Sequence, residues 1–171
     1  MKIKCDLCGG QTTIKSSQRH QYEECGLDNI ILVNIQMRVC KSCGAKAPII
    51  PRILGLHATI GRAVALQAYP LSGLEVRFLR KQLGMSAREW AVLLRIDHTT
   101  LSRWENDEQR IGPQSDALIR FLYFRMVEEK EGKLIPDHIS ERIAAPSQKR
   151  KKHASVLVNM NNPTVYSYQC A

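Results

Sequence analysis

The chain has 171 residues, of which 44% are hydrophobic and 24% charged, a composition that fits a folded protein and excludes a disordered one. No apolar run approaches the roughly 20 residues of a membrane helix, and the first residues lack the apolar stretch of a secretory signal. We therefore expect a cytoplasmic protein with no membrane partner, whose thiols stay reduced. The net charge of +9 suits a polyanionic partner, but the basic excess is spread along the chain, so any affinity for a polyanion must depend on where individual charges lie.

Residues 1–47 are expected to form a small β-rich module enclosed by two Cys-x-x-Cys pairs. Residues 31–39 alternate with a period of two, as a strand does, and residues 12–15 and 20–24 are weaker strand candidates. Zinc prefers four soft ligands in a tetrahedron, and each pair supplies two thiolates from one tight turn. Bound metal also supplies folding free energy to a unit too small for a large core. We therefore predict one structural Zn²⁺, and its ligands are Cys5, Cys8, Cys40 and Cys43.

Two alternatives to zinc ligation exist for these four thiols. In the first, the cysteines have no common function. In the second, they are redox-active, and a thiol oxidoreductase would use Cys5 and Cys8. Such an enzyme needs a lowered thiol pKa in a reactive environment, whereas four paired thiolates favour closed ligation. Cys25 and His20 lie outside the two pairs and are expected to be ordinary residues, and no other catalytic set is evident. We therefore expect a protein that is not an enzyme.

Beyond the cysteine module the pattern becomes helical. Prolines punctuate the exit from the module, and we predict a linker over residues 48–72 that contains a helix at 52–68. An all-α domain is predicted over residues 73–132, with helices at 73–83, 87–94, 98–106 and 113–131. The apolar face of its last helix is expected to be Leu118, Phe121, Leu122 and Met126. Residues 133–171 are expected to be a mobile basic tail, with a short strand at 155–160 as the alternative.

Residues 83–106 carry the pattern of a helix-turn-helix. Ser86 followed by Glu89 is a capping box that starts one helix, and Asp97 can cap the next. Leu101 and Trp104 bury one side of this second helix, which leaves a polar side free to enter the major groove of DNA. Arg103 can pair bidentately with a guanine edge. The predicted DNA contacts are His98, Thr99, Thr100, Ser102 and Arg103, with Ser86, Arg88 and Arg110 at phosphates.

The alternative for this segment is a plain helical hairpin with a solvated polar face. Against it, residues 73–125 resemble the Xre family of lambda-repressor-like helix-turn-helix domains, through "LRKQLGMSAREWAVLLRI" and "TTLSRWEN". The resemblance implies a structural ion pair between Arg80 and Glu105. The chain departs from the family at Ala87, where Gln is common, and at Asp107, where Gly is common and where we expect a different exit from the recognition helix.

The order of parts resembles the MqsA/YgiT-type zinc finger and helix-turn-helix proteins, of which "LSGLEVRFLRKQLGMS" is typical. This resemblance implies an α+β fold, with a small β-rich four-cysteine zinc module followed by an all-α lambda-repressor-like domain. It also implies a homodimeric repressor that reads double-stranded operator DNA. In such proteins the zinc module often neutralises an mRNA-cleaving toxin, so an antitoxin role is included in the hypothesis. The alternative is a zinc-dependent protein-interaction module with little or no DNA-binding role.

Overall fold

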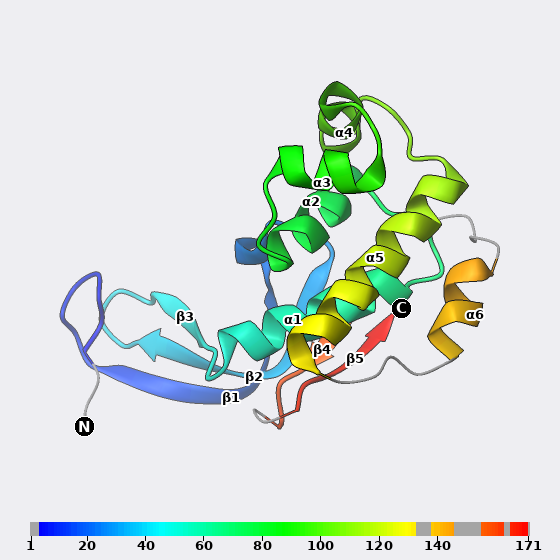
Figure 1. The fold of residues 1–171 in the computed structure, drawn as a ribbon. Coiled ribbons are helices and arrows are strands. Elements are labelled where there is room, and N and C mark those ends of the chain that lie inside the picture. Colours follow the sequence, from blue (N-terminus) through cyan, green and yellow to red (C-terminus); the bar gives the residue numbers. More distant parts are fainter. Residues whose placement is uncertain (1–3, 133–137, 146–154, 163–164, 171) are drawn as a thin grey trace.

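The computed structural model describes residues 4–132, 138–145, 155–162 and 165–170. A sheet forms one side of the molecule and helices cover it, with the helix-turn-helix helices at one end (Figure 1). The strands are β1 (Thr12–Gln21), β2 (Ile30–Cys40), β3 (Lys46–Ile49), β4 (Val156–Asn159) and β5 (Ser167–Cys170). The helices are η1 (Glu23–Cys25), α1 (Ile53–Leu66), α2 (Gly73–Gln82), α3 (Ala87–Leu94), α4 (His98–Glu105), α5 (Pro113–Glu131) and α6 (His138–Ala144). The expected α+β fold is confirmed.

β2 is the central strand of the sheet. β1 pairs with it antiparallel on one side. On the other side, β3 pairs antiparallel with its C-terminal half and β4 pairs parallel with its N-terminal half, while β5 extends the sheet beyond β4. The predicted short strand at 155–160 is confirmed as β4, and the expected mobile tail is wrong for β4 and β5, because both strands belong to the sheet and Val156 and Val158 are buried. The basic run at 149–152 lies outside the described residues.

α1 lies at the centre of the molecule, although the sequence places it in a linker. It contacts β4 and β5 of the sheet and also α2, α5 and α6. The close approach to α5 depends on Gly61, where a Cβ atom would lie only 2.1 Å from the Tyr123 hydroxyl. Arg120 of α5 donates to the carbonyl oxygens of Ala65, Gln67 and Tyr69 at the end of α1. One continuous apolar core therefore crosses the expected boundaries at residues 47 and 72.

α5 buries only part of the face expected. Ile119, Tyr123 and Phe124 face the core and the expected Leu122 and Met126 are half-buried against it, while Leu118 and Phe121 are 41% and 53% exposed. The helix is apolar on both sides, so periodicity alone fits either stripe, and the contact with α1 decides which one is buried. Within the described residues, no helix combines the length and the hydropathy needed to cross a membrane.

Candidate metal site and nucleic-acid interface

The two Cys-x-x-Cys pairs fold into turns with the same hydrogen bonds. The N–H of Gly9 donates to the carbonyl of Cys5 at 2.9 Å, and the N–H of Gly44 donates to that of Cys40 at 3.1 Å. Both glycines have positive φ, 68° and 74°, a backbone conformation that glycine adopts without strain. The β1–β2 pairing, which runs from Thr12 opposite Cys40, brings the two turns together.

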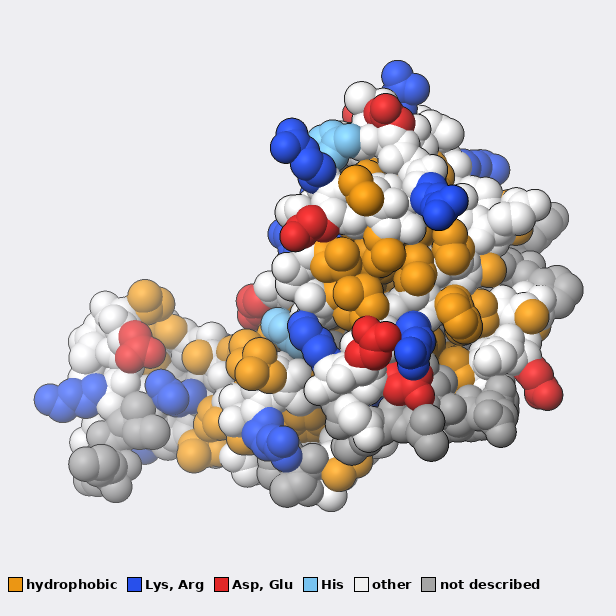
Figure 2. All heavy atoms as spheres, in the orientation of Figure 1, with side chains coloured by type: hydrophobic (Ala, Val, Ile, Leu, Met, Phe, Trp, Pro, Cys, Tyr) orange, Lys and Arg blue, Asp and Glu red, His pale blue; other side chains and the backbone are white. Residues whose placement is uncertain are grey.

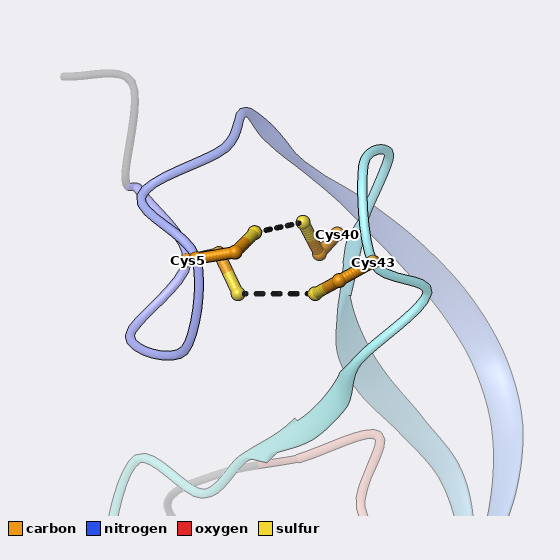
Figure 3. A group of neighbouring side chains, drawn as sticks. Cys5, Cys40 and Cys43 are labelled. Atoms are coloured by element: carbon orange, nitrogen blue, oxygen red, sulfur yellow. Dashed lines mark hydrogen bonds between the residues drawn. The ribbon is translucent and has the colours of Figure 1, made fainter.

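The four cysteine sulfurs face one another across the two turns (Figure 3). The sulfur of Cys5 lies 3.7 Å from that of Cys43, and the sulfur of Cys8 lies 3.5 Å from that of Cys40. All four lie within 4.8 Å of one another. Four sulfurs at the usual zinc–sulfur distance would stand roughly 3.8 Å apart, whereas a disulfide needs about 2.05 Å. The cluster can therefore hold a metal ion and does not have the spacing of two disulfides.

The cysteines of the cluster shift one another's pKa values in opposite directions. The pKa of Cys40 is lowered to about 6, because the backbone N–H groups of Cys43 and Ser42 donate to its sulfur. The Gly10 N–H lowers the pKa of Cys8, but hydrogen bonds with the Cys43 and Cys40 sulfurs outweigh it and raise that pKa to about 12. One thiol thus keeps its proton beside a neighbouring thiolate, as like charges require. A divalent cation would remove that conflict by stabilising all four thiolates.

Cys25 and His20 lie outside this cluster. The Cys25 thiol donates to the carbonyl of Tyr22 at 3.1 Å, and burial raises its pKa. The His20 ring lies 3.2 Å from the Glu24 carboxylate. Neither residue belongs to a group that could hold a metal ion in the described part of the chain.

Capping residues define both helices of the helix-turn-helix. The Ser86 hydroxyl accepts from the Glu89 N–H at 3.2 Å, and the Glu89 carboxylate accepts from the Ser86 N–H at 2.8 Å, so the predicted capping box is confirmed. Arg95 ends α3 in the left-handed region with φ 54°, which turns the chain into α4. Asp97 then caps α4 by accepting from the Thr99 N–H at 2.8 Å.

α4 has one buried side and one exposed side. Leu101, Trp104 and Glu105 are buried, at 0%, 4% and 6% exposure. Four of the predicted contact residues on the opposite side are exposed: His98, Thr99, Ser102 and Arg103. The fifth, Thr100, is half-buried. At this end of the molecule, basic, acidic and histidine side chains gather on the surface (Figure 2).

The Thr99 hydroxyl already has a hydrogen-bond partner within the protein. It donates to the Asp97 carboxylate at 2.7 Å, in addition to the cap bond from the Thr99 N–H. These two bonds lower the pKa of Asp97, with a smaller contribution from the nearby His98 and Arg103. The methyl group and the hydroxyl lone pairs of Thr99 are therefore what remains to face a ligand.

α4 is attached to α2 by a buried ion pair. Arg80 donates to both carboxylate oxygens of Glu105, at 2.7 and 2.8 Å. This bidentate pairing raises the pKa of Arg80. Arg77, which the sequence analysis did not single out, also donates to the Glu105 side chain at 3.3 Å and to its carbonyl at 3.0 Å. The orientation of α4 relative to α2 therefore depends on one carboxylate held by two guanidinium groups.

A second contact joins the end of α4 to the start of α2. Asp107 has φ 57°, so the chain leaves α4 through the left-handed backbone region that glycine favours. Its carboxylate accepts from the Gly73 N–H at 2.9 Å and thereby caps α2. Aspartate at position 107 thus supplies a contact between the end of α4 and the start of α2 that a glycine could not make.

The three predicted phosphate-contact residues lie on the exposed surface. Arg88 is in the first turn of α3, and Arg110 follows α4. Ser86 and Glu89 use each other as capping partners, so at the start of α3 only the N–H groups of Ala87 and Arg88 are left for an anion. Arg95, in the turn between α3 and α4, is a further exposed cation that the sequence analysis did not select.

The helices that carry the predicted DNA contacts match a known protein family. Residues 76–115 match the helix-turn-helix family HTH_3. The matched range begins within α2, includes α3 and α4, and ends in the first turn of α5, and it supports a DNA-binding regulator of the Xre type. The cysteine cluster lies outside it. No curated protein and no solved structure matches the chain.

Proposed function

We propose that this protein is a sequence-specific transcriptional repressor that acts as a homodimer and lays α4 into the major groove of operator DNA. The observation that carries the proposal is the exposed polar side of α4, whose opposite side is fixed by Leu101, Trp104 and the Glu105 ion pair. A helix that the fold holds in a fixed orientation, with several polar side chains exposed, can contact base edges in the major groove. A freely solvated hairpin would not need a bidentate buried ion pair to fix its orientation.

In this proposal each exposed residue has a distinct role. Arg103 donates bidentately to a guanine, the contact that its planar guanidinium suits best. Thr99 offers its methyl group to a thymine, because its hydroxyl already donates to Asp97. His98 and Ser102 contact bases or phosphate, Thr100 lies at the edge of this surface, and Arg88 and Arg110 contact the sugar-phosphate backbone on either side.

We propose Zn²⁺ as the ion of the cysteine cluster, with Cys5, Cys8, Cys40 and Cys43 as its four ligands. Tetrahedral thiolate ligation is the preference of zinc, and a fully ligated ion supplies structure without an open position for catalysis. The expected content is one zinc per chain, measured by metal analysis of protein purified without added metal. Loss of zinc from the Cys40→Ser variant would agree, and a full complement of metal in that variant would contradict the assignment.

An antitoxin role is the more specific form of the proposal. The cysteine turns lie at the end of the sheet away from α4 (Figure 1), so a protein partner could be held there while α4 stays on DNA. Leu7 within the first turn is 82% exposed, and Ile14 on β1 is 59% exposed. Such side chains suit a protein partner better than phosphate. The partner we propose is an mRNA-cleaving toxin.

The proposal is tested by selecting duplexes from a random-sequence pool with the full chain. We expect two enriched half-sites related by two-fold symmetry and spaced by whole helical turns. Affinity for the selected site should fall steeply as salt rises, because phosphate contacts release counterions. Enrichment of no sequence, together with co-purification of a protein partner, would favour the interaction-module alternative over the repressor.

A further inference from the structure

An apolar patch covers the surface between α3 and α5 (Figure 2). Its members are Val92 and Leu93 on α3 and Leu118 and Phe121 on α5, exposed by 72%, 40%, 41% and 53%. We call these four side chains the α3–α5 patch. The half-buried Ala117 and Leu122 lie on the same helix beside it. An apolar patch of this kind on one surface is often a contact site for another molecule.

α5 itself indicates that the patch is covered. Ile119, Tyr123 and Phe124 already attach one side of the helix to the core, and the patch residues make the other side apolar as well. Between Ala117 and Phe124 only Arg120 is charged, and a stretch of helix with apolar side chains on both sides is expected to be covered on both. α1 offers no comparable surface, because it already packs against the sheet, α2 and α5.

We propose that the α3–α5 patch is the surface through which two copies of this chain pair around a two-fold axis, an inference that rests on the proposed function for its purpose. In a two-fold contact the same surface meets itself, so a charged patch would repel its own copy. No member of the patch is charged, so the patch does not repel its own copy, and the exposed Arg88 and Glu89, one turn before Val92 and Leu93 on α3, would lie at its rim. The nearest charges further along α5, Arg125 with Glu128 and Glu129, are already paired within the helix.

The size of the patch fits a dimer of modest strength. Its four side chains expose on the order of 400 Å², about half of what each partner contributes to a standard interface. Ala117, Leu122 and a polar rim would supply the remainder. The dimer should therefore dissociate on dilution and be reinforced when both copies bind one operator.

The position of the patch also suits the repressor. It lies on the flank of the helix-turn-helix, while the exposed side of α4 is at the end of the molecule (Figures 1 and 2). Pairing through this flank would leave the reading residues of both copies uncovered. The patch would thus set the spacing between two half-sites without contacting DNA.

The test is the oligomeric state of the full chain without DNA, measured by sedimentation equilibrium over a range of concentrations. Wild type should show a reversible monomer–dimer equilibrium. Phe121→Lys places like charges against each other across the axis and should remain monomeric throughout the range. Val92→Lys, at a more exposed position, should do the same and guards against a folding defect at position 121. Circular dichroism reports whether each variant is folded.

The matched control is Leu54→Lys, which replaces an 82% exposed leucine at the start of α1, outside the patch. It should dimerise as wild type does. A monomeric wild type, or a folded Val92→Lys variant that still dimerises, would overturn the inference. Because the measurement contains no DNA, a wild type that dimerises through the patch but selects no duplex would contradict the repressor function alone.

Discussion

The orientation of α4 relative to α2 depends on Glu105. Its side chain is 7% exposed, and Arg80, at 10%, contacts it from α2. Taking one partner out of such a pair leaves a buried charge without compensation, which costs far more than the pair itself contributes. Arg125 and Glu129 form an exposed ion pair on α5, with side chains 54% and 60% exposed, and solvent weakens such a pair.

Glu105→Ala should therefore lower the free energy of unfolding by about 3 kcal/mol. Glu129→Ala should lower it by less than about 1 kcal/mol. Urea denaturation of the two variants beside wild type measures both values. Equal, small losses would show that the two arginines on Glu105 are solvated and do not hold α4 in place.

His57 makes stability depend on pH. It lies on α1 between Tyr22, whose hydroxyl is 2.9 Å from its Nε2, and the Phe78 ring of α2. Burial lowers the pKa of His57 from 6.5, so the unfolded chain binds this proton more tightly than the folded one. Stability from the neutral imidazole is thus complete above about pH 6.5 and is lost as pH falls toward the lower folded pKa.

His57→Gln should reduce the loss of stability between pH 7 and 5, a loss that one such group limits to about 1.4 kcal/mol per pH unit. The measurement is the free energy of unfolding at several pH values. His98→Gln, at the exposed end of α4, is the control and should keep the wild-type dependence. An unchanged slope in His57→Gln would mean that other groups cause the acid sensitivity.

At the scale of elements, α2 and α4 approach so closely that their backbones touch. A Cβ atom on Gly73 would lie 2.1 Å from the carbonyl oxygen of Trp104 and 2.9 Å from the carbonyl carbon of Glu105. Neither atom can move without moving α4. Gly55 in α1 is the opposite case, because a Cβ there meets nothing nearer than 3.8 Å.

Gly73→Ala should lower the free energy of unfolding by about 1–3 kcal/mol, because overpacking against backbone forces the helices apart. Gly55→Ala should raise it by up to about 1 kcal/mol, because alanine favours the helix. Thermal denaturation of both variants gives the comparison. A neutral Gly73→Ala would mean that α4 is loosely seated on α2.

For the whole molecule, the decisive feature is the return of the C-terminal segment to the centre of the sheet. β4 pairs with β2 about 125 residues earlier in the chain, with Ile30 opposite Val156 and Leu32 opposite Val158. Val158 is fully buried and Val165, between β4 and β5, is 70% exposed. The first and last parts of the chain therefore share one core.

Val158→Ala should lower the free energy of unfolding by about 2 kcal/mol through lost burial and a small cavity. Val165→Ala should change it by less than about 0.5 kcal/mol. Urea denaturation of both variants and of wild type measures these differences in the free energy of unfolding. A harmless Val158→Ala would favour the expected mobile tail over the pairing of β4 with β2.

The sequence predicted what depends on local pattern. The capping box at Ser86, the cap at Asp97 and the buried side of α4 follow from residues a few positions apart, and the structure contains each of them. What it could not predict depends on distant partners. The parallel pairing of β4 with β2 has no local signal, and the choice between the two apolar stripes of α5 is made by α1.

The candidate site divides in the same way. The four cysteines were identifiable from their spacing, because both pairs form local turns and a hairpin brings the turns together. Arg77 was missed, since only the fold brings its guanidinium to Glu105. The engagement of the Thr99 hydroxyl by Asp97 was also missed, although its two-residue spacing is the local signal of a cap.

The central claim is that α4 reads DNA through Arg103, and one comparison tests it most directly. Arg103→Ala and Arg19→Ala remove the same charge, the first from α4 and the second from an exposed position on β1. On the duplex that wild type selects, Arg103→Ala should lose about 1–3 kcal/mol of binding and relax base preference at one position per half-site. Arg19→Ala should keep the preference at every position. Equal behaviour of the two variants, with base preference intact in both, would contradict the claim.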